Sequence, residues 1–543
     1  MPMSYNIAQT LVAVAAKFPE RTGLIVPSAK GYLRWTFAEL RENSARFANV
    51  LTQCEVRKGD RVMLMVKPSM EFVCLTFALF QMGAVVILID PGMGYRNLLR
   101  CIGSVKPTVF IGIGKAHLFK TIFRKTFTTI RISLLAGPGF WPFARSLAHL
   151  AAHASTEYDM VDSAREELAA IIFTTGSTGP PKGVQYTHGI FSAQLQYIRN
   201  YYRITSYDRD QPAFPLFALF STALGACAVI PDMDPSRPAQ VDPQKFVKTI
   251  QDHDVTYSFG SPAIWNVVSR YCLEKKITLG VKKILMAGAP VSGELVERVK
   301  KIMAPGGEVF TPYGATESLP IVSISGTEIL AETWPLTRKG KGTCVGRPLP
   351  GIEIRIMEPV EGAVKKLGEV RLLVQGAIGE IIVKGDVVTR AYDHNDRENS
   401  LAKISDGHSF WHRMGDMGYL DEKGRLWFCG RKAHRVQTES ETLYTICCEA
   451  IFNEHPKVFR SALVGIGEIG RQLPVLIVEP TERIADEAGF FAELAELGRQ
   501  CSMTAGISRF LIHPSFPVDI RHNAKIFREK LAVWAAERIG GGV

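Results

Sequence analysis

The segment from Ile171 to Gly183 has the composition of a loop that holds phosphate groups. An apolar run, Ile171 to Phe173, leads directly into hydroxyl residues, glycines and one lysine. Glycine lets backbone N–H groups turn toward an anion, hydroxyls donate further hydrogen bonds, and lysine supplies positive charge. An ordinary surface turn needs only one or two of these residue types. The residues that we expect to contact phosphate are Thr174, Thr175, Gly176, Ser177, Thr178, Gly179 and Lys182.

The spacing of this loop differs from the Gly-x4-Gly-Lys-Ser/Thr pattern of ordinary phosphate-binding ATPases. The sequence from Thr174 to Gly183 instead resembles, nearly residue for residue, the signature loop of the acyl-adenylate-forming superfamily. That superfamily includes acyl-CoA synthetases, peptide-synthetase adenylation domains and luciferases. The resemblance covers almost the whole chain. It implies an enzyme that uses ATP and Mg²⁺ to convert a carboxylic acid into an acyl-adenylate, with release of pyrophosphate.

Further motifs of the same superfamily follow in the expected order. The resemblance implies that Gly288, Ala289 and Pro290 form the adenine pocket. The segment from Tyr313 to Glu317 resembles the motif whose Thr contacts phosphate and whose Glu binds magnesium. The nucleotide-binding positions implied by this part of the resemblance are Gly288, Ala289, Pro290, Tyr313, Gly314 and Thr316, and the metal ligand is Glu317.

Three residues nearer the C-terminus complete the resemblance. Asp416 matches the acid that binds both ribose hydroxyls, and Arg431 matches an arginine that reaches ribose and phosphate. Lys525 lies where the superfamily keeps its mobile adenylation lysine. Positive charge must surround a carboxylate that attacks the α-phosphorus, and Mg²⁺ prefers oxygen ligands. The predicted catalytic residues are Lys525, Thr175, Glu317, Lys182 and His434.

The chain departs from the superfamily where relatives admit coenzyme A. Ala433 occupies the position of the hinge, and no glycine follows Gly430 until Gly465. Every residue other than glycine brings a Cβ into the path of the pantetheine arm, so close backbone approach is harder. Ala218 stands where relatives often place His or another gate residue. These departures argue against the thioester half-reaction.

The segments Thr438 to Tyr444 and His522 to Ile526 resemble those of the olefin-biosynthesis β-lactone synthetases of bacteria. That resemblance implies a 2-alkyl-3-hydroxy fatty acid as substrate, whose own hydroxyl displaces AMP and closes a β-lactone. It also implies association with other enzymes of olefin biosynthesis. His434 and His522 are the candidates for a general base in motif context. The alternatives are a long-chain acyl-CoA synthetase and an inactive scaffold or interaction protein.

An acyl substrate requires a long apolar cavity with a polar end. We expect Phe214, Phe217, Phe220, Leu224 and Trp265 to line it, although core packing is the more common fate of any such residue.

Apolar periodicity predicts an α/β fold. Helices are expected over 44–54, 71–82, 246–253 and 263–271, alternating with strands over 61–66, 84–89, 256–259 and 283–287. Such alternation favours layered α/β subdomains with largely parallel sheets. From about Gly342 a β-rich lobe is expected. After Gly430 the pattern predicts a small, mobile α+β domain. We therefore divide the chain into residues 1–430, which bind ATP and the acyl group, and residues 431–543.

Composition limits the alternatives further. The chain has 543 residues, 46% of them hydrophobic, and ten scattered cysteines that suit reduced core thiols. Residues 1–18 suit neither a signal peptide nor a membrane span, so a cytoplasmic location is expected. The net charge of +11 does not by itself identify a partner, and we expect no nucleic acid.

The stretch from Lys115 to Arg145 combines six basic residues with six aromatic ones. Such a stretch suits a membrane surface or a docking partner, because cations attract anionic headgroups while rings enter the interface. The alternative is a solvated helix with its apolar face on the protein core. A peripheral membrane contact through 115–145 is thus one of two interpretations, and the packed helix is the commoner of them.

Overall fold

A seven-stranded sheet supports the first third of the chain. The computed structural model describes residues 5–174, 180–519 and 525–540. The strands run in the order β7-β6-β5-β3-β4-β8-β9, all parallel except β9. Their bounds are β3 Arg61–Met65, β4 Val85–Leu88, β5 Val109–Gly112, β6 Ile132–Leu135, β7 Arg145–Ser146, β8 Leu168–Phe173 and β9 Gly183–Thr187. The predicted strands over 61–66 and 84–89 are confirmed.

Helices cover both faces of this sheet. Helices α2 (Phe37–Gln53) and α3 (Met70–Gln81) pack on one face, and α4 (Tyr95–Val105) and α5 (Gly114–Ile122) pack on the other. The predicted helix over 44–54 begins earlier, because the Thr36 side chain accepts a hydrogen bond from the Glu39 N–H in a capping box. The short helices α1 (Gln9–Lys17) and α6 (Leu147–Ala151) complete the layers.

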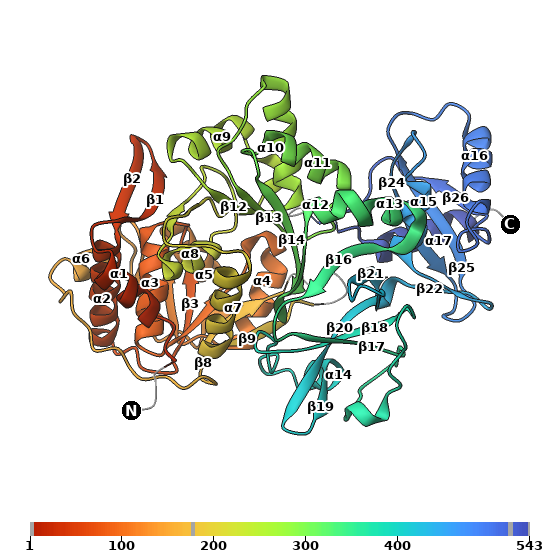
Figure 1. The fold of residues 1–543 in the computed structure, drawn as a ribbon. Helices are drawn as coiled ribbons and strands as arrows, with labels where there is room; N and C mark the ends of the chain where they lie inside the picture. Colours follow the sequence, from red (N-terminus) through yellow and green to blue (C-terminus); the bar gives the residue numbers. More distant parts are fainter. Residues whose placement is uncertain (1–4, 175–179, 520–524, 541–543) are drawn as a thin grey trace.

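The second sheet is larger and changes character along its width (Figure 1). One half is largely parallel, with β1 Thr22–Ser28, β10 Arg209–Asp210, β11 Cys227–Val229, β12 Tyr257–Gly260, β13 Lys283–Met286 and β14 Glu308–Ala315, and β2 Gly31–Thr36 at its edge. The other half is antiparallel, with β15 Ser318–Ser325, β16 Thr343–Pro348, β17 Glu353–Met357, β18 Gly379–Lys384, β19 Lys403–Asp406, β20 Ser409–Leu420 and β21 Leu426–Arg431.

The β-rich lobe therefore continues the α/β sheet. The hairpin β14–β15 pairs Tyr313 with Val322, and Val322 in turn pairs with Pro348 of β16. Helices α7 (His188–Tyr201), α8 (Phe217–Leu224), α9 (Pro243–Asp252), α10 (Pro262–Lys275) and α11 (Gly293–Ile302) flank the sheet, and α14 (Asp396–Ala402) lies in the lobe. In α9 the Asp242 carboxylate caps the first turn, which explains why this helix begins before the predicted Phe246.

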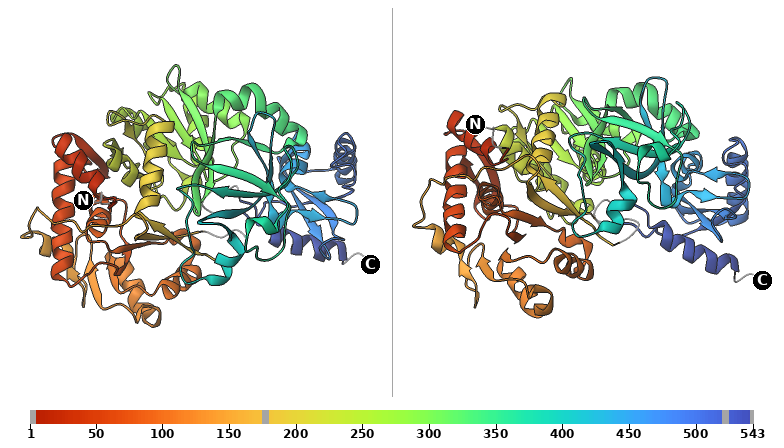
Figure 2. Two further views of the ribbon diagram at one scale, coloured as in Figure 1. Left: turned by 60° about the horizontal axis from the view of Figure 1, so that its bottom comes forward. Right: turned by 90° about the horizontal axis from the view of Figure 1, so that it is seen from below.

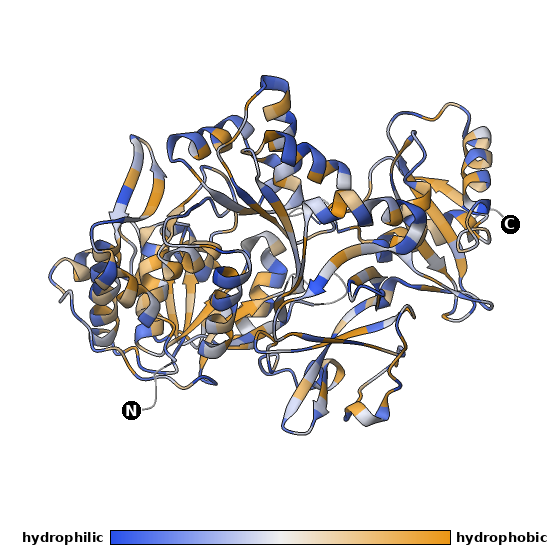
Figure 3. Cartoon of the chain, in the orientation of Figure 1, coloured by the Kyte–Doolittle hydropathy of each residue, from blue (hydrophilic) through white to orange (hydrophobic). Residues whose placement is uncertain are grey.

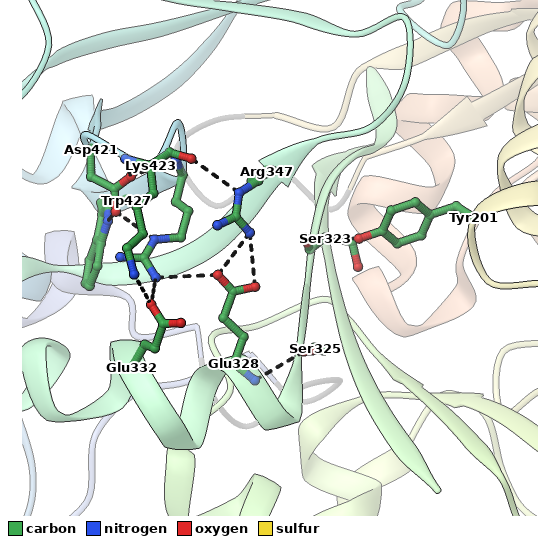
Figure 4. A network of polar contacts seen from close by, with 10 residues as sticks. Tyr201, Ser323, Ser325, Glu328, Glu332, Arg347, Asp421, Lys423 and Trp427 are labelled. Atoms are coloured by element: carbon green, nitrogen blue, oxygen red, sulfur yellow. Dashed lines mark hydrogen bonds and ion pairs between the residues drawn. The ribbon is translucent and has the colours of Figure 1, made fainter. Parts of the chain in front are cut away.

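Ion pairs attach the lobe to the short helical segment that leads into it (Figure 4). Glu328 ends α12 (Gly326–Glu328) and lies 3.0 Å from Arg347 of β16. Arg425, which is almost fully buried, lies 2.9 Å from Glu332 and 2.7 Å from Asp421. The helical segment continues through η4 (Ile329–Thr333), α13 (Trp334–Leu336) and η5 (Thr337–Lys341).

The C-terminal domain lies to one side of the molecule (blue in Figures 1 and 2). Its sheet comprises β24 Val458–Ile466, β25 Leu473–Pro480 and β26 Arg509–Ile512, with helices α15 Thr445–Phe452, α16 Glu487–Arg499 and α17 Arg528–Gly540. A small hairpin joins β22 Val436–Gln437 to β23 Thr442–Leu443. Two apolar clusters lie wholly within residues 436–539. The boundary at 430/431 and the mobility of this domain remain predictions.

Apolar residues concentrate on the strands and on the inner faces of the helices (Figure 3). Nine of the ten cysteines are buried and all ten are free thiols, as the composition predicted. In the described part of the chain, no helix combines the length and apolarity needed to cross a bilayer. The predicted α/β architecture with a small α+β C-terminal domain is confirmed.

Candidate active site

The two ends of the predicted phosphate loop are held together where β8 passes into β9. The Thr174 N–H donates to the Lys182 carbonyl at 3.0 Å, and the Lys182 N–H donates to Thr174 Oγ1 at 3.3 Å. Thr174 and Lys182 both line a large cavity that extends between the domains. The other predicted loop residues, Thr175, Gly176, Ser177, Thr178 and Gly179, lie outside the described residues.

The Lys182 side chain makes contacts that the sequence did not predict. Its ammonium group forms an ion pair with Glu398 and lies 5.0 Å from the ring centre of Tyr392. The Tyr392 hydroxyl donates to Glu317 Oε1 at 2.8 Å. Burial and the Glu317 carboxylate raise the pKa of Tyr392 well above its usual value. Tyr392 thus connects the phosphate-loop lysine with the predicted magnesium ligand, although nothing in its sequence context marked it.

The turn between β14 and β15 carries Glu317. At Gly314 a Cβ atom would lie 2.4 Å from the Ser318 carbonyl oxygen, so only glycine fits this turn. The Tyr186 hydroxyl donates to the Thr316 carbonyl at 2.6 Å and fixes the other side of the turn. Gly288, Ala289 and Pro290 follow β13, the neighbour of β14, and line the same cavity. The structure therefore places the predicted adenine segment and the predicted metal ligand in the wall of one cavity.

Asp416 and Arg431 face each other on adjacent strands. They are paired in the register of β20 and β21, and Arg431 Nη1 lies 3.0 Å from Asp416 Oδ1. The Tyr313 hydroxyl donates to Asp416 Oδ2 at 2.5 Å. The Asp416 carboxylate raises the pKa of Arg431. Burial raises the pKa of Asp416, and the charges of Arg431 and Lys525 oppose that rise.

The C-terminal domain contributes Lys525 and His434 to the cavity wall. The Lys525 backbone is fixed by Asp519, whose N–H donates to the Lys525 carbonyl and whose Oδ1 accepts from the Lys525 N–H, both at 3.0 Å. His434 Nε2 lies 2.9 Å from Glu529 Oε1, at the start of α17. Burial acts to raise the pKa of Glu529, but the hydrogen bond with His434 outweighs this effect, and the pKa is lowered. The second base candidate, His522, lies outside the described residues.

The cavity has a volume of about 1160 Å³ and is polar at one end and apolar at the other. Phe214, Phe217 and Phe220 line the apolar part, as predicted, and the Phe217 ring stacks on Phe259 with centroids 3.7 Å apart. The predictions for Leu224 and Trp265 are wrong. Both pack in the core, because those sides of α8 and α10 face neighbouring elements rather than the cavity.

A buried polar group lies in the apolar wall of the cavity. Ser221 Oγ donates to Asp210 Oδ2 at 2.5 Å, and the Tyr257 hydroxyl donates to Ser221 Oγ at 3.1 Å. Asp210 Oδ1 has no well-directed hydrogen bond from the described residues. Burial raises the pKa of Asp210 to about 8. The sequence analysis missed this group, and the only available signal was an acid directly before the phenylalanine-rich run.

The residues around the polar end suit a nucleotide. Asp416 Oδ1 is buried beside Arg431 Nη1 but accepts no well-directed hydrogen bond from the described residues, so it can still accept one from a ligand hydroxyl. No three His, Cys, Asp or Glu side chains of the described chain converge into a metal site. A single carboxylate such as Glu317 nevertheless suits Mg²⁺, because this ion is usually held by one or two carboxylates together with phosphate oxygens of the substrate.

Comparisons with known proteins agree with this arrangement. A family model described as AMP-binding enzyme matches residues 11–393. The olefin beta-lactone synthetase of Xanthomonas campestris pv. campestris is 42% identical, with 98% of each chain covered. That of Stenotrophomonas maltophilia is 39% identical with the same coverage.

Solved structures share the fold. An ATP-bound RpMatB-BxBclM chimera aligns with 99% of this chain and 100% of its own, at a TM-score of 0.78 and 21% identity. The AMP complex of O-succinylbenzoate coenzyme A synthetase from Bacillus subtilis aligns with 96% of this chain and 97% of its own, at a TM-score of 0.74 and 23% identity.

Proposed function

Because the chain belongs to the AMP-binding enzyme family, we propose that it adenylates a 2-alkyl-3-hydroxy fatty acid with ATP and then closes a β-lactone. The observation that carries the lactone is the 42% identity, over 98% of both chains, to a protein named olefin beta-lactone synthetase. A cavity that joins a polar end to a phenylalanine-lined end supports an acyl substrate.

In the proposed complex, Asp416 and Tyr313 hold the ribose while Arg431 reaches ribose and phosphate. Thr174, Lys182 and the intervening loop hold the phosphates. Glu317 holds Mg²⁺, which when bound screens the negative charge of the phosphates. Binding of ATP then competes with Glu398 for the Lys182 ammonium group, since these two residues form an ion pair in the structure.

The proposed reaction has two displacements. A carboxylate oxygen of the acid attacks the α-phosphorus, and pyrophosphate leaves with the electron pair of the broken P–O bond. Lys525 stabilises the charge that develops there. The substrate hydroxyl oxygen then attacks the acyl carbon, AMP leaves, and the hydroxyl proton passes to a base. Holding hydroxyl and carbonyl in one molecule makes this step unimolecular.

His434 is our candidate for the base. A neutral imidazole that donates from Nε2 to Glu529 keeps its lone pair on Nδ1, so the pair at 2.9 Å favours the tautomer that accepts a proton there. His434 also lines the cavity. Glu529 would then position the ring without touching the substrate.

The main alternative is a long-chain acyl-CoA synthetase, and the second is an inactive scaffold. The absence of glycine between Gly430 and Gly465 favours the lactone over the thioester. We further propose that other enzymes of olefin biosynthesis supply the hydroxy acid and take the lactone, and that the chain contacts a membrane peripherally through 115–145.

One experiment separates these functions. The full chain is incubated with ATP, Mg²⁺ and a 2-alkyl-3-hydroxy fatty acid, with and without coenzyme A, and the products are identified by NMR. We expect AMP and a β-lactone in both samples, because the nucleophile is part of the substrate. The same acid without its hydroxyl is the control and should yield only bound adenylate. A thioester formed only with coenzyme A would favour the synthetase, and no ATP turnover with any acid would favour the scaffold.

A further inference from the structure

The positive charge of the chain is concentrated in one segment. Residues 91–156 contain nine Lys and Arg residues and no Asp or Glu. Nine of the eleven excess positive charges therefore belong to these 66 residues, and the rest of the chain is almost neutral. A block of one charge sign in an otherwise balanced protein indicates an interaction with the opposite sign.

This segment supplies β5, β6 and β7 of the seven-stranded sheet and the helices α4 and α5 that cover one of its faces (orange in Figure 2). The inward side chains of α4, α5 and η2 (Arg124–Phe127) are buried against the sheet, among them Ile102, Ala116 and Phe127. Other apolar side chains of the same helices point to solvent. Leu118 is 50% exposed and Ile122 is 64% exposed, one helical turn apart on α5. The packed-helix interpretation therefore holds for the inner face, while the outer face leaves apolar side chains exposed to solvent.

The loop between β6 and β7 carries two exposed aromatic residues. Phe140 is 86% exposed and Phe143 is fully exposed. Phe143 also has a positive φ of 65°, a conformation that costs free energy for a residue with a side chain. Trp141 attaches the loop to α5, since its ring stacks on His117 with centroids 6.0 Å apart. The loop is therefore anchored to α5 through Trp141, while Phe140 and Phe143 of the same loop are exposed to solvent.

Exposed basic residues surround these apolar tips. Lys115 lies one turn before Leu118, and Arg124 and Lys125 follow Ile122 after a single residue, Phe123. Tyr95 of α4 stacks on Phe123 with centroids 6.2 Å apart, which brings the exposed Arg96 to the same region. We call this surface the basic aromatic face, defined as Tyr95, Arg96, Lys115, Leu118, Ile122, Arg124, Lys125, Phe140 and Phe143.

We propose that the basic aromatic face docks on an anionic lipid bilayer. Cations attract anionic headgroups, and apolar tips that enter the interfacial layer add affinity without needing a complementary pocket. A nucleic acid offers nothing to receive Leu118 and Ile122. The parallel strands β6 and β8 end on the same side of the sheet. The loop with Phe140 and Phe143 follows β6, and the predicted phosphate loop follows β8, four strands away, which corresponds to about 19 Å. The inference does not depend on which acid the enzyme uses.

Vesicle flotation with the full chain tests the proposal. Vesicles of phosphatidylcholine alone are compared with vesicles that also contain phosphatidylglycerol, at about 0.1 M and 0.5 M NaCl. We expect binding to the anionic vesicles at least about tenfold above the neutral ones, and weaker binding at high salt. The variants Phe140→Ser with Phe143→Ser, and Arg124→Glu with Lys125→Glu, should each lose most of this binding.

Matched controls change exposed residues elsewhere. Ile469→Ser with Val533→Ser removes two apolar residues that are 74% and 61% exposed on the C-terminal domain. Lys275→Glu with Lys276→Glu reverses an exposed basic pair at the end of α10. These variants should bind like the parent protein. Equal binding to neutral vesicles, equal losses in the controls, or no vesicle binding would overturn the proposal. Loss of association with another protein, without any vesicle binding, would assign the face to a protein partner instead.

Discussion

Lys525 and Glu317 line the polar end of the cavity and belong to different domains, so the role of each can be tested by its own substitution. In the proposed mechanism both act on charge that develops during adenylation. Removing one such group typically costs about 100- to 1000-fold in rate. We expect losses of that size for Lys525→Ala and Glu317→Ala, measured as acid-dependent release of pyrophosphate.

Lys530→Ala is the matched control for Lys525→Ala. Lys530 lies on α17, its ammonium group packs over the Phe527 ring, and it is not among the residues that line the cavity. This variant should retain the parental rate. Parental rates in Lys525→Ala or Glu317→Ala would refute the assignment of these two residues.

Asp210 makes the stability of the fold depend on pH. Burial raises its pKa from 3.8 to about 8, so the folded protein keeps a proton that the unfolded chain loses between these values. Stability therefore falls as pH rises through this interval, by at most about 1.4 kcal/mol per pH unit. Asp210→Asn should flatten that fall, as measured by thermal unfolding from pH 5 to 9.

The exposed Asp254, whose side chain is 90% accessible, provides the comparison. Asp254→Asn should leave the pH profile of the melting temperature unchanged. A profile for Asp210→Asn identical to that of the parent would show that Asp210 is ionised in the folded protein at neutral pH.

At the scale of elements, the turn η7 (Lys432–His434) is held from both sides. Lys432 Nζ lies 3.0 Å from the buried Glu380, and Arg435 lies 2.6 Å from the exposed Glu361, both on the β-rich lobe. His434 pairs with Glu529 of α17. The turn that follows Arg431 thus connects the lobe with the helix that begins three residues after Lys525.

The two carboxylates of this connection differ in burial, and their removal should differ in cost. Glu380 is 2% exposed and also pairs with Arg413, so Glu380→Ala removes the buried carboxylate that Arg413 and Lys432 share. We expect a loss of about 3 kcal/mol in the free energy of unfolding, measured by urea denaturation. Glu361→Ala, at 78% exposure, should cost less than about 1 kcal/mol. Equal losses would mean that the Glu380 network is not a stability determinant.

At the scale of the whole molecule, the cavity is assembled from parts that are far apart in the sequence. The first sheet supplies the ends of the predicted phosphate loop, the second sheet supplies Tyr313, Asp416 and Arg431, and the C-terminal domain supplies Lys525. The thiols of Cys429 and Cys447 meet where α15 packs against β21, so the smaller domain shares core contacts with the larger. The C-terminal domain therefore contributes to the cavity wall while part of its core is continuous with that of the larger domain.

The sequence alone was enough to predict many helices and strands, the main motifs and the family of this protein. Strand and helix positions were predictable because burial of one face imposes a period of two or 3.6 residues on the chain. The phosphate loop and the Asp416, Arg431 and Lys525 motifs could be recognised because their chemistry constrains residue type at short spacing. The same local patterns indicated the family, and with it the adenylation chemistry.

Only the tertiary structure decided which side chains meet. Tyr392 joins Lys182 to Glu317 without any local signal, and Asp210, marked only by its place before a phenylalanine-rich run, lies in the apolar wall of the cavity. A pattern of apolar residues states that a face is buried but not whether a core or a cavity covers it, which is why Leu224 was misassigned. The same limit applied to residues 115–145, because apolar residues occur on both the buried face and the exposed face of this segment. Contacts between distant segments depend on how whole elements pack, and no short window of sequence contains that information.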